Sequence, residues 1–440
     1  MVTPETDAPE RRGAPRPAYR DGNVLRWLTA YTASLVGDSV YFVALAWSAQ
    51  QVAGPTEVGL VMAMGSLPRA LLMLGGGVAA DRFGPRRVVL GSDTVRCLII
   101  LAVAATVALT APALWILIAT ALVFGAVDAL FMPAVGALPP RLTSPDQLAR
   151  VTGMRSLTIR LSQIAGPPIG GLAMGLGGPA AAFAVAGVLF ALSLPLLLTM
   201  RLRPLETDRG EQRAPTGGAW QDVVDGLRYI RRQRVIFPLV LVGAVCELGL
   251  TGTLNVGMVL LNGERGWGAT GYGVIISAFG AGAAASAALL AVVGWLPRGG
   301  LTMSATLLVG CAGAATIALV PALWLAVAVA AITGLAAGVF GSLNNTLIQT
   351  EADPAFLGRV TSVVMLTSVG IAPLTYPLVG AAIGAWGSAA VFVGSGVFAS
   401  IGVVIALASS AVRRAELPRQ RPAPAESEKD AGTAGDVREP

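Results

Sequence analysis

The chain has 440 residues, of which 54% are hydrophobic and 13% are charged, and its mean hydropathy is +0.70. About a quarter of the residues of a soluble domain are charged, so this composition excludes a soluble globular protein and predicts a polytopic membrane protein. The sequence has no histidine, and Lys429 is its one lysine, which excludes imidazole proton relays, histidine metal ligands and a Schiff-base lysine within the membrane.

Six apolar runs make up the first half of the chain. Residues 1–20 are polar and rich in Pro and Arg, and we expect them to form a disordered cytoplasmic leader. Residues 21–200 then hold runs that are each long enough to cross a bilayer. They lie near residues 25–50, 58–80, 88–110, 114–135, 151–176 and 180–200. This half is predicted to be an N-terminal bundle of six helices.

A polar segment at residues 201–235 divides the chain. We expect a cytoplasmic linker there that ends in an amphipathic helix, whose arginines, such as Arg228 and Arg231, suit an anionic membrane surface. Residues 236–412 repeat the plan of six apolar runs, and residues 413–440 are expected to form a disordered cytoplasmic tail. The predicted fold is all-α and polytopic, with twelve transmembrane helices in two pseudo-symmetric six-helix bundles. Such a layout is typical of a transporter with its site between the halves near the midplane.

The arginines of the links between runs predict the orientation in the membrane. Odd-numbered links offer only Arg265, whereas the even-numbered links carry Arg82, Arg141, Arg201, Arg298 and Arg359. Because positive loops stay on the cytoplasmic side, both termini are predicted to be cytoplasmic, in a bacterial inner membrane. The same distribution accounts for the net charge of +6 without a nucleic-acid partner.

The link between the second and third runs combines glycines with a basic cluster. Its pattern is Gly, three residues, Asp, Arg, any residue, Gly and two cations, formed by Gly77, Asp81, Arg82, Gly84, Arg86 and Arg87. This resembles the loop between the second and third spans of the major facilitator superfamily. The resemblance implies a gating loop, in which the aspartate locks a neighbouring helix end in the outward-open state. We assign Asp93 and Arg96, one turn into the next helix, to the same switch, and an ordinary positive-inside loop is the alternative.

A second motif lies in the fifth run. Gly166, Pro167, Gly170 and Gly171 are spaced as in the Gly-Pro-x-x-Gly-Gly antiporter motif of exporters in the same superfamily, which this segment resembles. Gly153 stands at the upstream position of that motif, and a serine replaces a glycine between them. Proline removes a backbone hydrogen bond and small residues allow close helix packing, so general helix packing is the alternative interpretation.

Shorter segments narrow the resemblance to one branch. Residues 37–38, 131–134, 226–230 and 358–360 are similar to the macrolide-efflux and siderophore-exporter group. This implies export of a drug, macrolide, siderophore or secondary metabolite. The arginine motif found in the fourth helix of many proton-coupled drug antiporters is missing, and Asp128 lies in that helix instead.

Ionisable groups at membrane depth are costly and face cavities or partners, so each is a functional candidate. They are Asp38, Arg69, Asp128 and Glu247. We expect an ion pair between Asp38 and Arg69 and a pair between Asp128 and Arg160, while Glu247 is the counterpart of Asp38 in the second half. Structural ion pairs, or a carboxylate that is only hydrogen-bonded, are the alternatives. Further polar candidates for the cavity are Asn255, Asn344, Asn345 and Gln349.

The sequence and its resemblance together predict a secondary active transporter that exports a small amphipathic organic molecule by proton antiport and alternating access, and the resemblance implies a monomer. Asp38 or Glu247 would carry the proton. No cofactor or metal is expected, because no nucleotide-binding loop is present and the three cysteines lie far apart. We expect no enzymatic activity. The alternatives are an importer or uniporter of the same fold, and a membrane sensor or scaffold that transports nothing.

Overall fold

The computed structural model describes residues 17–202, 219–293 and 298–415, except for the side chains of residues 73–78, 81, 219, 220 and 222. Most of the expected leader, of the linker before the amphipathic helix and of the expected tail lies outside these residues. The same is true of the side chain of Asp81 and of Gly77, whose backbone is helical.

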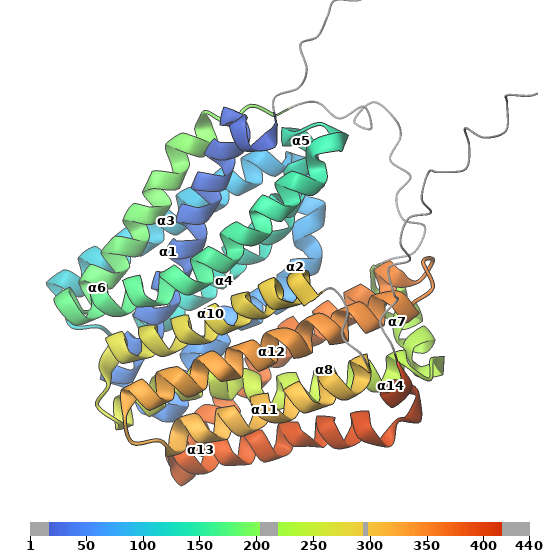
Figure 1. Cartoon of the computed structure of the whole chain (residues 1–440). Coiled ribbons are helices and arrows are strands. Elements are labelled where there is room, and N and C mark those ends of the chain that lie inside the picture. The colour runs from blue at the N-terminus through green and yellow to red at the C-terminus, as the bar shows by residue number, and fades with distance from the viewer. Residues whose placement is uncertain (1–16, 203–218, 294–297, 416–440) are drawn as a thin grey trace, which may run out of the picture.

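The first half consists of long helices joined by short links (Figure 1). The links hold the short helices η1 (Ala18–Arg20), α5 (Pro139–Leu142) and η2 (Pro145–Gln147). Gly178, with φ 67°, reverses the chain inside the last long helix, α6, so that this helix crosses the membrane twice. The long helices are α1 (Gly22–Val52), α2 (Pro55–Phe83), α3 (Pro85–Leu109), α4 (Leu114–Gly136) and α6 (Leu148–Leu198).

The second half repeats this plan after the amphipathic helix α7 (Ala219–Arg232). Its first span is continuous through α8 (Ile236–Gly252), the π-helical turn η4 (Thr253–Gly257) and α9 (Met258–Glu264). Gly387, with φ 78°, turns the last long helix as Gly178 turns α6. The remaining helices are α10 (Gly268–Val293), α11 (Gly299–Leu319), α12 (Leu323–Glu351), α13 (Leu357–Ala408) and α14 (Ser410–Arg414).

The described residues contain nine helices that are long and apolar enough to cross a membrane. Two of them, α6 and α13, cross twice because of their glycine turns. The remaining span is helix α2, in which the side chains of residues 73–78 and 81 are not described. The predicted fold of twelve transmembrane helices in two bundles is confirmed.

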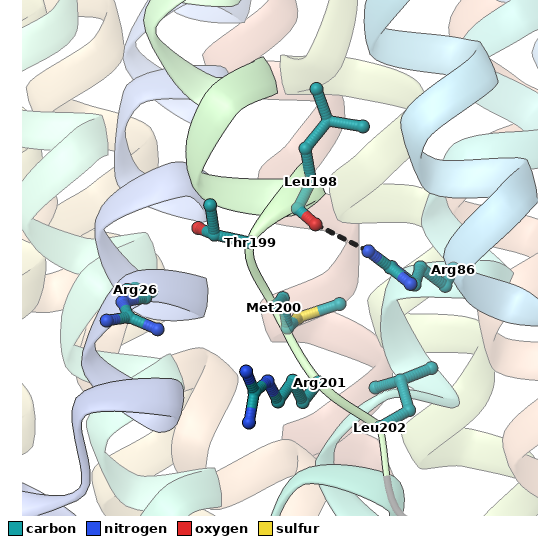
Figure 2. A pocket seen from close by; sticks show the side chains of 7 residues that line it. All are labelled: Arg26, Arg86, Leu198, Thr199, Met200, Arg201 and Leu202. Atoms are coloured by element: carbon teal, nitrogen blue, oxygen red, sulfur yellow. Dashed lines mark hydrogen bonds between the residues drawn. The ribbon is translucent and has the colours of Figure 1, made fainter.

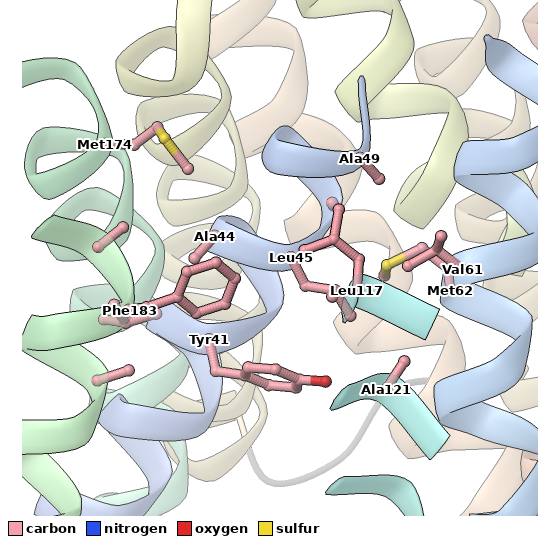
Figure 3. Close-up of a cluster of buried hydrophobic side chains, with 14 of the residues drawn as sticks. Tyr41, Ala44, Leu45, Ala49, Val61, Met62, Leu117, Ala121, Met174 and Phe183 are labelled. Carbon is pink, nitrogen blue, oxygen red and sulfur yellow. The ribbon is translucent and has the colours of Figure 1, made fainter. Parts of the chain in front are cut away.

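Among the described residues, the two bundles share a hydrophobic core at one end. We call the end that holds residues 17 and 415 the terminal end, and the other the opposite end. At the opposite end one hydrophobic core includes Tyr41 and Leu117 of the first half (Figure 3) together with Leu260 and Ile383 of the second. At the terminal end each half has its own core of described residues.

Close helix contacts seal the opposite end. Helix α2 packs against α13, and α6 packs against α10. A Cβ atom on Gly59 would lie 2.4 Å from the carbonyl oxygen of Tyr376, so only glycine permits this approach. Figure 1 shows the two bundles diverging from this end towards α5 and α7. The chain is therefore closed between its halves at the opposite end and separated at the terminal end.

Candidate functional site

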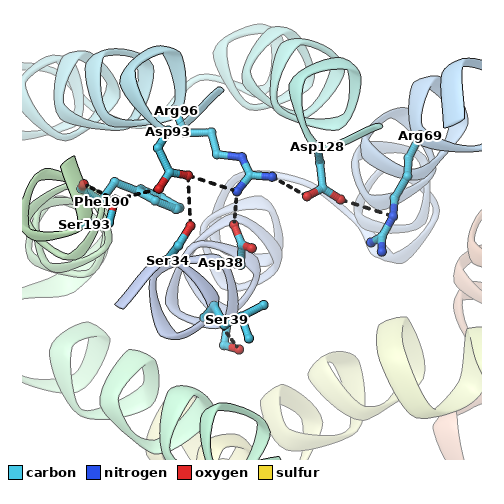
Figure 4. Close-up of polar contacts among 10 residues, drawn as sticks. Ser34, Asp38, Ser39, Arg69, Asp93, Arg96, Asp128, Phe190 and Ser193 are labelled. Atoms are coloured by element: carbon cyan, nitrogen blue, oxygen red, sulfur yellow. Dashed lines mark hydrogen bonds and ion pairs between the residues drawn. The ribbon is translucent and has the colours of Figure 1, made fainter. Parts of the chain in front are cut away.

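A network of ion pairs lies within the first bundle, near the middle of four helices (Figure 4). Its centre is Arg96 of α3, whose side chain is 0% exposed. The Nη1 atom of Arg96 lies 3.4 Å from Oδ1 of Asp38 on α1 and 3.5 Å from Oδ1 of Asp93, one turn earlier on α3. Its Nη2 atom donates a hydrogen bond to Asp128 of α4. Arg69 of α2 completes the network, with Nε 3.1 Å from the other oxygen of Asp128.

Local sequence places these side chains. Asp93 and Arg96 are three residues apart, so they share one face of α3. A Cβ atom on Gly125 would lie 2.0 Å from the carbonyl oxygen of Gly65, so glycines let α2 and α4 approach closely one turn from Arg69 and Asp128.

Aromatic rings surround the guanidinium of Arg96. Its Cζ atom lies 4.0 Å from the ring centre of Phe131 and 5.2 Å from that of Phe124. Such cation–π contacts offset part of the cost of burying a cation. Two serines also hold Asp93 in place. Ser34 and Ser193 donate hydrogen bonds of 2.9 Å and 2.6 Å to its two carboxylate oxygens.

Asp38 is the least hydrogen-bonded carboxylate of the network. Its side chain is 14% exposed, and its Oδ1 atom is buried without a hydrogen-bond partner among the described residues. The 3.4 Å approach of Arg96 is thus an ion pair without a hydrogen bond. The network contains three carboxylates and two guanidiniums. With every group ionised it carries one excess negative charge, which a proton on one carboxylate would remove.

The pairing differs from the one expected from the sequence. Arg69 pairs with Asp128 and not with Asp38, and Asp128 pairs with Arg69 and Arg96 and not with Arg160. The sequence indicates the position of each residue along its helix, but the direction of each side chain around that helix depends on packing. Asp93 and Arg96 also belong to this buried network, away from the loop to which we assigned them.

Glu247 of α8 is held by two hydroxyl groups in the second bundle. Thr251, one turn later, donates to Oε2 at 2.5 Å, and Ser368 of α13 donates to Oε1 at 2.9 Å. No cation pairs with this half-buried carboxylate in the part of the chain that the structure describes. The four-residue spacing of Glu247 and Thr251 was visible in the sequence, whereas Ser368 comes from a distant helix and no sequence signal marked it.

The other polar candidates lie on α12 and in the π-helical turn. Asn255 is exposed, and its amide donates to the carbonyl oxygen of Thr251. Asn345 and Gln349 are also exposed and share a hydrogen bond of 3.1 Å, while Asn344 has a buried oxygen without a partner among the described residues. Exposed amides at membrane depth are tolerated where they face water. Their place in a substrate cavity stays a prediction.

The gating loop is a tight glycine turn. Gly84, with φ 83°, ends α2 and begins α3, and a proline follows at the first helical position. Arg86 donates a hydrogen bond of 2.6 Å to the carbonyl oxygen of Leu198 at the end of α6. Arg82 and Arg87 are exposed. The switching role predicted for the loop and for Asp81 stays a prediction.

The antiporter motif lies where α6 packs against both α1 and α10. A Cβ atom on Gly166 would lie 2.4 Å from Cβ of Ser39 on α1, and one on Gly171 would lie 2.5 Å from the carbonyl oxygen of Ala269 on α10. The motif also includes Gly170, whose Cβ would meet Val43, and Pro167, whose carbonyl faces Gly273, whereas Gly153 has open space around it. Thus the motif's small residues join α6 to both halves.

The sequence as a whole matches one family. The family model described as Major Facilitator Superfamily matches residues 27–371. This chain belongs to the Major Facilitator Superfamily. It is a multi-pass membrane transporter, as the resemblance of its motifs implied, and its transport partners are small molecules.

Curated relatives of this superfamily member include siderophore exporters. The chain is 25% identical to the protein named enterobactin exporter EntS of Shigella boydii serotype 18 over 346 residues, which are 78% of this chain and 80% of that protein. The same identity and coverage hold for enterobactin exporter EntS of Escherichia coli O1:K1.

Solved structures share the fold at low identity. The nucleoside transporter NupG superposes with a TM-score of 0.68 at 12% identity, covering 90% of this chain and 100% of that one. A bacterial homologue of the human lysosomal transporter Spinster, in an inward-facing and occupied conformation, gives 0.68 at 14% identity and covers 91% of this chain and 97% of that one.

Proposed function

We propose that this protein is a proton-coupled exporter of a small amphipathic organic molecule, such as a siderophore, macrolide or other secondary metabolite. It acts as a monomer in the bacterial inner membrane and uses the proton gradient as its energy source. One observation supports coupling to protons: the buried network around Arg96 holds three carboxylates and only two guanidiniums among the described residues. The 25% identity to the enterobactin exporters supports the direction and the substrate class.

The terminal end faces the cytoplasm in this proposal. The arginine-rich links lie at that end, as the positive-inside rule requires. The structure is then an inward-open state, because the halves are separated at the terminal end and share a core at the opposite end. Rocking of the halves about the α2–α13 and α6–α10 contacts would close the terminal end and open the other.

Asp38 is the proposed proton carrier of the first half. Protonation removes the excess charge, and it occurs on the carboxylate whose Oδ1 atom has no hydrogen-bond partner among the described residues. Release of the proton would restore the full attraction of Asp38 for Arg96, 3.4 Å away. The proton would thus change the forces that hold α1 against α3.

Glu247 is the proposed substrate contact of the second half. Two hydroxyl donors keep its carboxylate in place without neutralising its charge. It would attract a cationic group or a hydrogen-bond donor of the substrate, with Asn255, Asn344, Asn345 and Gln349 supplying further polar contacts. A site of this kind combines a few polar groups with an apolar surround, as amphipathic substrates require.

The test is accumulation of candidate compounds in inside-out membrane vesicles with an imposed proton gradient. Catecholate siderophores, macrolides and dyes are compared with and without a proton uncoupler. Asp38→Asn should abolish gradient-driven accumulation, whereas Asp225→Asn should leave it unchanged, because Asp225 lies exposed on α7 in an ion pair of 2.9 Å with Arg228. Gradient-driven accumulation by the Asp38→Asn protein would refute the coupling proposal, and flux in the other direction would indicate an importer.

A further inference from the structure

A recess of about 830 Å³ lies at the terminal end of the first bundle, away from the ion-pair network (Figure 2). It is lined by Arg26 of α1, Arg86 of α3 and residues 198–202, where α6 ends. These elements are tied together there. Arg86 donates to the carbonyl oxygen of Leu198, and the amide of Asn23 and the backbone of Arg201 exchange two hydrogen bonds of 2.6 Å and 2.8 Å.

The recess is strongly positive. Three of its lining residues are arginines and none is an acid. Within the described parts of the chain, none of Arg26, Arg86 and Arg201 forms an ion pair with a carboxylate. The Nε atom of Arg86 is buried and has no hydrogen-bond partner there. Arg86 also sits in the first turn of the 25-residue helix α3, whose N-terminus carries a partial positive charge.

The edge of the recess is apolar and open. Leu198, which lines it, exposes 57% of its surface although it is the last residue of a membrane helix. Apolar side chains at the end of a membrane helix lie against acyl chains. The recess therefore combines guanidiniums, which bind phosphate well, with a lipid-facing edge.

We propose that this recess binds the phosphate group of an anionic phospholipid from the leaflet that faces the terminal end. Arg26 and Arg201 hold the phosphate oxygens, Arg86 adds its positive charge from the wall of the recess, and an acyl chain lies along Leu198. The lipid joins the ends of α1, α3 and α6, next to the gating loop. The site rests on the membrane embedding of the chain, and it does not depend on the proposed substrate or on proton coupling.

The test is retention of added lipids by the purified full-length protein, measured by native mass spectrometry. Phosphatidylglycerol is compared with phosphatidylcholine, and sn-glycerol 3-phosphate serves as the soluble phosphate probe. The test variant is Arg26→Gln with Arg201→Gln, and the control is Arg413→Gln with Arg414→Gln, which removes two exposed cations from α14 in the second bundle. Arg86 is kept, because it also binds the end of α6.

The wild-type protein and the control should retain phosphatidylglycerol in preference to phosphatidylcholine. The test variant should lose on the order of 30-fold in affinity, because each cation near a membrane surface contributes about 1 kcal/mol, or roughly fivefold. The single variants should each lose about fivefold, so the proposal stays testable if the double variant does not fold. An equal loss in the control, or none in the variants, would refute the site. Equal occupancy by sn-glycerol 3-phosphate would overturn the lipid assignment in favour of a soluble phosphate.

Discussion

Replacement of Arg96 should destabilise the fold more than any other single change in the ion-pair network. In Arg96→Met the three carboxylates of Asp38, Asp93 and Asp128 lose the cation that faces all of them. Removing one partner of a buried ion pair costs about 3–5 kcal/mol, because the remaining charge stays buried. Loss of the cation–π contact with Phe131, whose ring centre is 4.0 Å away, adds about 2 kcal/mol, because the guanidinium is fully buried.

Arg69→Met is the matched control. Its side chain is 35% exposed and pairs with Asp128, which keeps its hydrogen bond from Arg96, so the expected cost is about 1 kcal/mol or less. Both variants are compared by equilibrium unfolding in mixed micelles. Adding Asp38→Asn to Arg96→Met should recover part of the loss, since it removes one uncompensated charge. Equal destabilisation by the two arginine changes would show that the network is not organised around Arg96.

Three further predictions concern other sites. Gly171→Ala should weaken the contact between the halves at the opposite end, because its Cβ would lie 2.5 Å from the carbonyl oxygen of Ala269. Interhelix distances measured between spin labels should then shift towards a state that is open at the opposite end. Gly153→Ala should leave these distances unchanged, because Gly153 has open space around it. Glu247→Gln should reduce transport of cationic compounds by about tenfold while sparing neutral ones, as vesicle accumulation would show. A hydrogen bond to a charged group contributes about 1.5–3 kcal/mol, against about 1 kcal/mol for a neutral acceptor. Gly84→Ala should cost about 1 kcal/mol in equilibrium unfolding because φ is 83° there, and an unchanged stability would contradict the glycine-turn argument.

The sequence by itself determined the class, the number of spans and the position of each charged group along its helix. Apolar runs of helical length admit few other structures in lipid, because every backbone polar group must be paired within its own segment. Gly178 and Gly387 lie between runs that the sequence already separates, and their positive φ angles reverse the chain there. The motifs near Gly84 and Gly166 identified the superfamily, because close helix contacts leave a glycine pattern that can be read along the chain.

Only the tertiary structure decided which charges meet. Asp38 and Arg69 lie at similar depths, yet the partner of Asp38 is Arg96 and the partner of Arg69 is Asp128. The rotation of each helix about its axis depends on packing against several neighbours at once, and a single chain's periodicity does not contain that information. The same reason hides Ser368 beside Glu247 and the arginines that gather around the end of α6. Depth follows from position along one helix, whereas pairing follows from how twelve helices pack together.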